Sequence, residues 1–483
     1  MPRNYALQVA SAFHREGKLR EAETLYRDLI SVDATCAEAH NDLGNVLCDA
    51  GRSQEAIGEY KRAIEINPRY FPAYNNAGTA LRDQGRVHEA IEAYRAALEL
   101  NPRIPEVYNN LGVALTQLGR SPEALAAYRD AIEMRPAYAD AHSNLGVALY
   151  ASGDAAEAVE FCSKAVELAP DSTTAHSNLS LILLGAGEYE RGWIEHEWRF
   201  KCNPMFISRP FAQPQWKGEA LNGRTILLHA EQGLGDTIQF SRFVPMVADR
   251  GGRVIVECQG ELVRLLEDLP GVTDVLPRGA EIPAFDLHCP FMSLPLAMKT
   301  IVETIPAKSY LHARPALEEQ WAQRLGKKSN LRIGLVWAGR STHSNDANRS
   351  MRFEQFLPLL GLDGVTFHSL QHGRAAQQMA GHPRIIAHTE ELTDFAETAA
   401  LIAQLDMVIS VDTAVAHLAG GMGKPVWIML PFASEWRWMI ARDDSPWYPT
   451  ARLFRQKTWG DWAGVVERIA DALKTLPHST MPP

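Results

Sequence analysis

Residues 41–68, NDLGNVLCDAGRSQEAIGEYKRAIEINP, decide how the first part of the chain folds, because the same pattern returns 34 residues later. Residues 75–102 read NNAGTALRDQGRVHEAIEAYRAALELNP. A fixed period of this length predicts a row of stacked supersecondary units. The positions that keep the period hold turn glycines (Gly17, Gly51, Gly85, Gly119, Gly153, Gly187), further glycines (Gly44, Gly78, Gly112, Gly146), alanines (Ala22, Ala56, Ala90, Ala124, Ala158), tyrosines (Tyr26, Tyr60, Tyr94, Tyr128) and prolines (Pro68, Pro102, Pro136, Pro170).

Each unit is expected to fold as two antiparallel helices. Gly44 and Ala56 are small enough for the two helices to pack closely. Gly51 occupies the turn between them, and Pro68 ends the second helix. The pattern resembles the tetratricopeptide repeat, a helix-turn-helix unit of 34 residues. The resemblance implies an all-α solenoid over residues 1–202, with five full repeats and a divergent sixth.

The sixth unit departs from the pattern after Gly187. Trp193, Trp198 and Phe200 follow, where the last unit of a solenoid normally presents polar residues to water. Such apolar bulk indicates a surface that is covered by something else. We therefore expect this helix to dock onto the next domain.

Four asparagines recur at one register of the repeats and would form a continuous row in a solenoid. Because an amide can both donate to and accept from a peptide backbone, the row could hold an extended polypeptide. The arrangement resembles the asparagine ladder in the repeat domain of O-GlcNAc transferases. In the alternative interpretation, the same side chains bridge helices within the stack. The row consists of Asn76, Asn110, Asn144 and Asn178.

Beyond a proline-rich connector at residues 203–221, short apolar runs alternate with amphipathic stretches. This alternation predicts an α/β fold with parallel strands. We expect two Rossmann-like halves, at residues 222–316 and 330–477, that face each other across a cleft. Ligands would then bind beyond the carboxyl ends of the strands. The expected strands cover residues 225–230, 253–257, 331–337, 365–370, 385–388, 407–411 and 425–430.

The loop after the first of these strands contains Gly233, Gly235 and Asp236 and opens a helix. The glycines allow backbone to approach a ligand, and the carboxylate would lie beside the cleft. An acidic residue in a first helical turn is also what simple capping predicts. From the residues alone, both interpretations of Asp236 stay open.

A second loop, after the strand at 407–411, begins a helix with Asp412, Thr413 and Ala414 and continues to His417. Free N–H groups and the helix dipole at such a start suit a phosphate. Thr413 and His417 are four residues apart, so both could donate to one diphosphate. The alternative is that His417 is an ordinary structural histidine.

Polar residues also follow two neighbouring strands. Gly339, Arg340 and Arg349 come after the strand at 331–337, where arginine suits anion recognition. A solvated surface loop is the alternative. Gln371 follows the strand at 365–370 and is a candidate contact to a nucleotide base by its location.

Several classes of protein are disfavoured by composition. A net charge of −10 argues against a nucleic-acid partner. No Asp-x-Asp occurs, so the usual carboxylate pair for a metal-bound nucleotide is missing and no metal or other cofactor is expected. Six cysteines without a CxxC pair, and no apolar run of about 18 residues, predict a cytoplasmic protein without a membrane span.

Together the loops resemble glycosyltransferase family 9, the heptosyltransferase-like enzymes with two Rossmann-like halves of the GT-B type. The resemblance implies that Asp236 is the general base for the acceptor hydroxyl. It also implies that Asp412, Thr413, Ala414 and His417 bind the diphosphate of a nucleotide sugar, although Ala414 stands where the family usually has glycine. The clear lysine expected after a Rossmann strand is missing, and Arg340 or Arg349 could replace it.

Repeats joined to such a domain resemble bacterial tetratricopeptide-linked glycosyltransferases. We therefore expect an inverting, metal-independent glycosyltransferase that modifies a protein hydroxyl, with the repeats recruiting the acceptor. Two alternatives stay open: a sugar transferase of lipopolysaccharide or capsule assembly, and a scaffold without catalytic activity.

Overall fold

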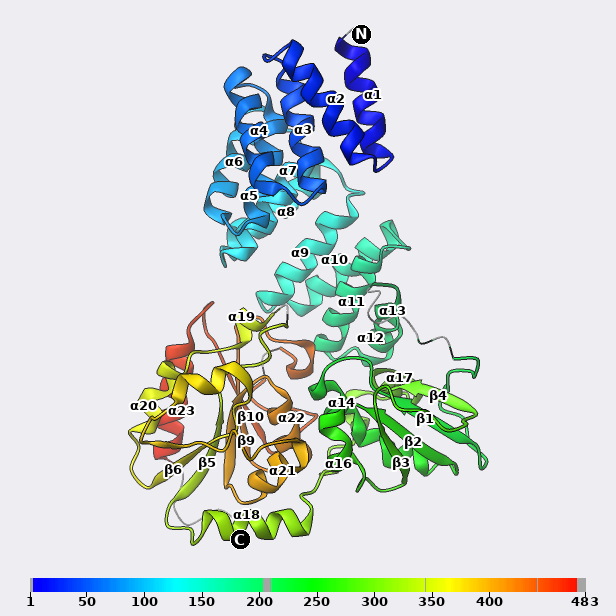
Figure 1. Cartoon of the computed structure of the whole chain (residues 1–483), viewed down its shortest axis with the longest axis vertical. Coiled ribbons are helices and arrows are strands. Elements are labelled where there is room, and N and C mark those ends of the chain that lie inside the picture. The colour runs from blue at the N-terminus through cyan, green and yellow to red at the C-terminus, as the bar shows by residue number, and fades with distance from the viewer. Residues whose placement is uncertain (1–2, 203–208, 210, 344, 441, 476–483) are drawn as a thin grey trace. The chain divides into compact units, whose positions relative to one another are not determined.

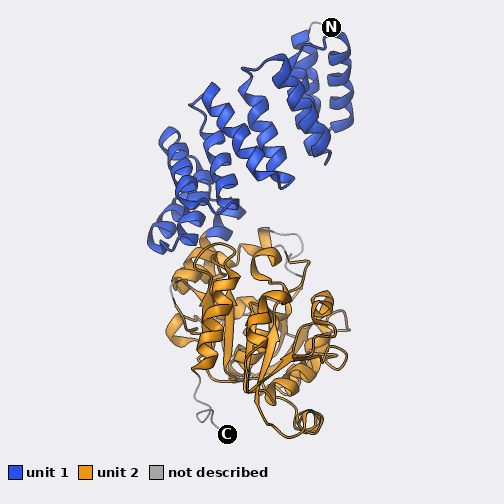
Figure 2. Ribbon diagram, turned by 90° about the vertical axis from the view of Figure 1, so that its left-hand side faces the viewer, with its two compact units in different colours: residues 1–178 blue, residues 179–483 orange. Residues whose placement is uncertain are grey.

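The computed structural model describes residues 3–202, 209, 211–343, 345–440 and 442–475. The chain forms two compact units, residues 1–178 and 179–483 (Figure 2). The first is an all-α repeat region and the second is an α/β domain with two parallel sheets. The division falls earlier than the boundary expected at residue 202, because the helix that carries Trp193 packs into the core of the second unit.

The first unit is a succession of helical hairpins, as the 34-residue period predicts (Figure 1). Gly51 has φ +75° in the turn between two helices, which confirms its expected place. A Cβ on Gly44 would lie 2.5 Å from Cε1 of Tyr60, so the close packing of the pair requires glycine. The helices are α1 (Arg3–Arg15), α2 (Leu19–Val32), α3 (Ala37–Asp49), α4 (Ser53–Ile66), α5 (Phe71–Asp83), α6 (Val87–Leu100), α7 (Pro105–Gln117), α8 (Ser121–Met134), α9 (Ala139–Ala151) and α10 (Ala155–Leu168). The division between the two units falls within α11 (Thr173–Ala186).

The same contact recurs along the unit. Gly78 lies against Tyr94 and Gly112 against Tyr128 in the way that Gly44 lies against Tyr60. In the fourth pair, the Sγ of Cys162 takes the place of the ring and lies where a Cβ of Gly146 would be. Four successive repeats, from Gly44 to Gly146, therefore have this close contact between their two helices.

The second unit contains two sheets in which every strand pair is parallel. The strand orders are β3-β2-β1-β4 and β10-β9-β8-β5-β6-β7. The sequence pattern did not predict β3, β4 or β10. The strands are β1 (Thr225–His229), β2 (Arg253–Cys258), β3 (Val272–Pro277), β4 (Leu287–Pro290), β5 (Leu331–Val336), β6 (Val365–Ser369), β7 (Ile385–Ile386), β8 (Met407–Val411), β9 (Val426–Leu430) and β10 (Ala451–Arg455).

The direction of winding changes at β1 in the first sheet, between β2 and β4, and at β5 in the second, between β6 and β8. Ligands of open α/β sheets bind at such points. The helices are α12 (Tyr189–His196), α13 (Arg199–Cys202), α14 (Leu234–Phe240), α15 (Val244–Ala248), α16 (Val263–Leu266), α17 (Leu294–Ala297), α18 (Pro315–Leu325), α19 (Asp346–Arg349), α20 (Leu357–Leu360), α21 (Phe395–Ala403), α22 (Ala414–Gly421) and α23 (Trp462–Lys474). Short 3-10 turns include η2 (Ser241–Phe243), η4 (Phe291–Ser293) and η8 (Trp436–Trp438).

Helix α12 contributes to the core of the second unit. The indole of Trp193 is 1% exposed and its Nε1 donates to the carbonyl oxygen of Thr300 at 3.0 Å. Its ring lies 6.3 Å from that of Phe240 and 5.4 Å from that of Trp436. Docking is therefore confirmed for Trp193, and α12 contacts both halves of the α/β domain.

Candidate functional site

The two loops that the sequence singled out meet between the halves of the second unit. A Cβ on Gly235 would lie 2.9 Å from Cδ2 of His417 and 3.6 Å from the Cα of Ala414. The glycine therefore lets α14 of the first half touch α22 of the second. The Gly233–Asp236 loop and the start of α22 therefore lie against each other.

The carboxylate of Asp236 has two partners. Its Oδ2 accepts from the Gly233 N–H at 2.9 Å, which is the capping contact. Its Oδ1 accepts from Nη2 of Arg437, which comes from the opposite half. The side chain of Asp236 is 19% exposed, so the carboxylate is both a helix cap and a group that faces the other half.

Arg437 is a site residue that sequence reasoning missed. Its side chain is 8% exposed, its Nε donates to Oε1 of Gln239 at 2.6 Å, and its Nη1 pairs with Glu435. The only local signal was its place between Trp436 and Trp438 in η8. Arg437 joins the two halves at the candidate base.

Helix α22 begins at the carboxyl end of β8. Thr413 is its N-cap residue, with φ −144° and ψ 169°, and its Oγ1 lies 3.0 Å from Oγ of Ser410. The Asp412 carboxylate is buried, and burial followed by the charge of Glu435 raises its pKa to about 6. Asp412 therefore changes charge close to neutral pH.

The buried imidazole of His417 is held from two sides. Its Nδ1 lies 2.8 Å from Oη of Tyr448, and its ring stacks on Trp438 at 5.4 Å. Its Nε2 is 3.8 Å from Oδ1 of Asp412. Burial, and then the charge of Arg437, holds the pKa of His417 well below its ordinary value. His417 is consequently neutral at physiological pH.

The loop after β5 reaches the same site. Arg349 Nη1 donates to the carbonyl oxygen of Asp412 at 3.2 Å, and a Cβ on Gly339 would lie 2.7 Å from Arg349 Nη2. Arg340 is exposed. Gln371 is buried and its Oε1 accepts from the N–H groups of Trp337 and Ala338, at 3.0 and 2.9 Å. The structure thus gives Gln371 a role in tying the loops after β5 and β6 together.

The asparagine row lies in the first unit and is bonded along its length. Nδ2 of Asn76 donates to Oδ1 of Asn41, and each later member donates to a residue 35 positions earlier. The Nδ2 groups of the row therefore bridge neighbouring repeats, as the alternative interpretation proposed. Among the hydrogen bonds of the described residues, Oδ1 accepts none in Asn110, Asn144 and Asn178.

Within the described ranges, no cluster of three or more histidine, cysteine or acidic side chains is arranged to hold a metal ion. Across the same residues, no helix is both long enough and apolar enough to cross a membrane.

Models of known families match both units. Tetratricopeptide repeat models match residues 35–103, 75–137 and 114–173. The model of glycosyltransferase family 9 (heptosyltransferase) matches residues 374–430. The chain thus carries tetratricopeptide repeats, followed by a segment that matches the glycosyltransferase family 9 model and includes Asp412–His417. The Gly233–Asp236 loop lies outside the matched segment.

A curated relative is Protein FlbA of Caulobacter vibrioides, 27% identical over 326 residues and matched by 61% of this chain. The chain spans about half, 54%, of the length of that protein. Solved structures similar to the repeats include YrrB, described as a TPR protein with an unusual peptide-binding site (25% identity, 35% of this chain and 88% of that chain, TM-score 0.31). Pseudomonas aeruginosa PilF is another (18% identity, 42% and 92% of the two chains, TM-score 0.38).

Proposed function

We propose that the second unit is an inverting, metal-independent glycosyltransferase that moves a sugar from a nucleotide sugar to a protein hydroxyl. The observation that carries the proposal is the contact of Gly235 with His417, which places Asp236 beside the start of α22. The match of residues 374–430 to glycosyltransferase family 9 supports the same reaction class.

In this mechanism the Asp236 carboxylate accepts the proton of the acceptor hydroxyl as its oxygen attacks the anomeric carbon. The bond from that carbon to the diphosphate oxygen breaks. The leaving diphosphate is stabilised by the N–H groups at the start of α22 and by the charge of Arg349. Arg437 orients Asp236 through the contact of its Nη2 with Oδ1 of the carboxylate. The nucleotide base would lie near the loops that Gln371 joins.

We further propose that the repeats hold the acceptor polypeptide along the asparagine row. Because the Nδ2 donors of the row are used between repeats, the side chains offer carbonyl oxygens to the N–H groups of an extended chain. Recognition of this kind does not read the acceptor's sequence. We place the reaction in the cytoplasm, where nucleotide sugars are made and the free thiols of the described cysteines persist.

The first test is thermal stabilisation by a panel of UDP, GDP, ADP and CMP sugars. A donor present at about 100 times its Kd stabilises the protein by about 2.7 kcal/mol. We expect one nucleotide class to stabilise the wild type and Asp412→Ala to abolish the shift. Stabilisation by no member of the panel would favour the scaffold.

The second test separates the role of Asp236 as a general base from the binding of the donor. Asp236→Asn should keep the donor-induced shift and lose transfer by about 100-fold or more. Asp471→Asn is the control, because that carboxylate is 77% exposed on α23 and should behave as wild type. Full turnover by Asp236→Asn would refute the base assignment.

The heptosyltransferase description of the matched family makes a saccharide acceptor the second candidate. The two acceptors are distinguished with the full chain. The double variant Asn110→Ala/Asn144→Ala should weaken transfer to protein, whereas transfer to a saccharide should be unchanged.

A further inference from the structure

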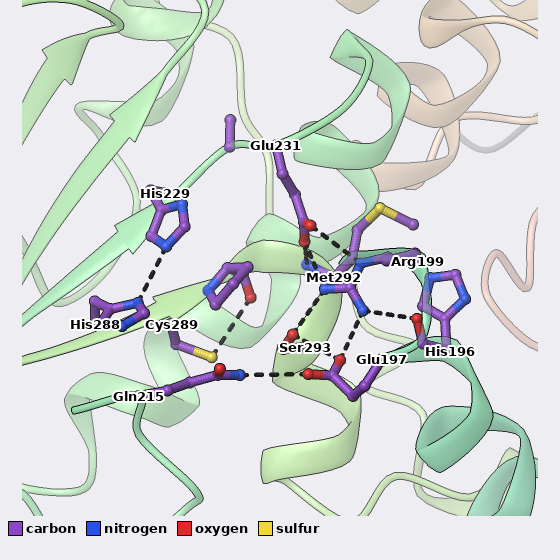
Figure 3. Close-up of polar contacts among 12 residues, drawn as sticks. His196, Glu197, Arg199, Gln215, His229, Glu231, His288, Cys289, Met292 and Ser293 are labelled. Carbon is purple, nitrogen blue, oxygen red and sulfur yellow. Dashed lines mark hydrogen bonds and ion pairs between the residues drawn. The ribbon is translucent and has the colours of Figure 1, made fainter. Parts of the chain in front are cut away.

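A buried ionic cluster lies against the loop that leads to Asp236 (Figure 3). Its members, here called the Arg199 cluster, are Glu197, Arg199, Glu231 and Ser293. The side chains of Arg199 and Glu231 are each 7% exposed. No residue of the cluster takes part in the reaction proposed above.

Arg199 makes a bidentate ion pair with Glu231. Its Nε donates to Oε2 at 3.0 Å and its Nη2 to Oε1 at 2.8 Å. Nη2 also donates to Oγ of Ser293 at 2.7 Å, and Nη1 donates to Oε1 of Glu197 at 2.6 Å. Figure 3 shows the guanidinium between the two carboxylates. The planar fork of arginine suits this set of acceptors, and lysine could not serve them together.

The cluster connects three segments that are distant in sequence. Arg199 lies in α13, which the sequence pattern assigned to the last repeat. Glu231 follows β1 and stands two residues before Gly233, and Oε1 of Glu231 also accepts from the Met292 N–H of η4 at 3.2 Å. The loops after β1 and β4 are therefore fixed to each other where the winding of the first sheet reverses.

The buried carboxylate of Glu231 needs the positive charge of Arg199 to stay in its place. Burial raises the pKa of Glu231 above its ordinary value, and the nearby guanidinium opposes that shift. Without the guanidinium, the buried carboxylate of Glu231 would face the partly exposed carboxylate of Glu197 with no cation between them. A buried carboxylate in that position must move toward water or take up a proton. Either change would displace the loop between Glu231 and Asp236.

Helix α12, which precedes α13 in the chain, packs next to a second residue that holds Asp236. Trp193 of α12 packs against Trp436, and the next residue, Arg437, binds Oδ1 of Asp236. Residues 189–202 thus contact the supports of Asp236 from two directions.

We propose that Arg199 is a positioning residue: through Glu231, it fixes the Gly233–Asp236 loop in the geometry that the reaction needs. The catalytic consequence rests on the function proposed above, whereas the ordering of the loop does not. Arg199 touches no reacting atom in this proposal.

The test uses Arg199→Lys in the full chain, which keeps the charge and removes the fork. We expect hydrogen exchange of the backbone N–H groups at residues 230–240 to become about tenfold faster, with exchange elsewhere in the second unit unchanged. Glu231→Gln should have the same local effect while preserving the size of the side chain. Arg264→Lys is the matched control, because Arg264 pairs with Asp394 and Glu397 at another place between the halves.

Once a donor and acceptor are known, Arg199→Lys should lower kcat by about 100-fold, the cost of a small misplacement, and leave the donor KM unchanged. Unchanged exchange at residues 230–240 in a folded variant would overturn the proposal. So would exchange that rises equally across the whole unit, since that is the result of a purely structural role. If the wild type shows no transfer, the function fails and the exchange data still decide the positioning.

Discussion

The contact between Asp236 and Arg437 predicts a measurable coupling across the two halves of the second unit. The perturbations are Asp236→Asn, Arg437→Met and the double variant. The side chains are 19% and 8% exposed, so the pair is far more buried than a surface ion pair. Surface pairs contribute about 1 kcal/mol or less, whereas removal of one partner of a buried pair costs about 3–5 kcal/mol.

The coupling is smaller than the single-variant costs because each side chain keeps other partners. Arg437 retains Gln239 and Glu435 when Asp236 becomes asparagine, and Asp236 retains the Gly233 N–H when Arg437 becomes methionine. We therefore expect Arg437→Met to cost about 3–5 kcal/mol and the coupling free energy to be about 2 kcal/mol.

The assay is urea unfolding followed by tryptophan fluorescence. All 11 tryptophans lie at residues 193–462, so their signal reports on the second unit and not on the repeats. Glu435→Gln, which removes a partner with a side chain that is 33% exposed, is the control and should couple more weakly to Asp236. A coupling below about 0.5 kcal/mol would show that Arg437 does not hold Asp236, and the account of the site would fail.

Three further predictions concern packing and pH. Gly112→Ala should destabilise the repeats by about 1–3 kcal/mol, because the new Cβ would lie 2.5 Å from Tyr128; Gly58→Ala, with nothing within 4 Å, should instead stabilise them, and circular dichroism of urea unfolding compares the two. The pKa of Asp412 is raised from 3.8 to about 6, so the folded state takes up its proton at higher pH than the unfolded state, and stability from this group rises as pH falls from 7 to 4. Asp412→Asn should accordingly be more stable than wild type at pH 7, by up to about 3 kcal/mol, with the difference gone near pH 4; a constant difference in fluorescence-monitored unfolding would contradict this. Trp193→Ala should lower the unfolding free energy of the second unit by about 3–5 kcal/mol in calorimetry, and an unchanged unit would disprove the docking of α12.

The repeats were predictable because their contacts are local in sequence. Gly44 and Tyr60 stand at fixed positions within one period, so a spacing of residues already implies a spacing in space. The glycine loop and the start of α22 were predictable for a similar reason, since each immediately follows a buried strand. That Asp236 caps its own helix and also faces the opposite half shows that both interpretations of one residue can hold together.

The sequence pattern could not predict contacts between residues that are far apart in the chain. Arg437 lies 201 residues from Asp236, and no local spacing connects the two. Arg199 and Glu231 lie on opposite sides of the domain boundary that the sequence pattern predicted at residue 202. The structure places both in the second unit, where they form an ion pair. Strand β3, with its partly exposed and charged face, lacks the apolar run by which strands such as β1 and β8 were predicted.

The close contact between glycine and tyrosine has a consequence for how the repeat array can evolve. The glycine and the tyrosine lie 16 residues apart in the same repeat, so a duplicated segment of the gene that encodes one repeat carries both partners of the contact. The hydrogen bonds between asparagine side chains of neighbouring repeats span 35 residues and form again wherever two such copies become neighbours. The array can therefore gain or lose whole units by recombination, whereas α12, whose partners occur once in the chain, has to be inherited together with the α/β domain.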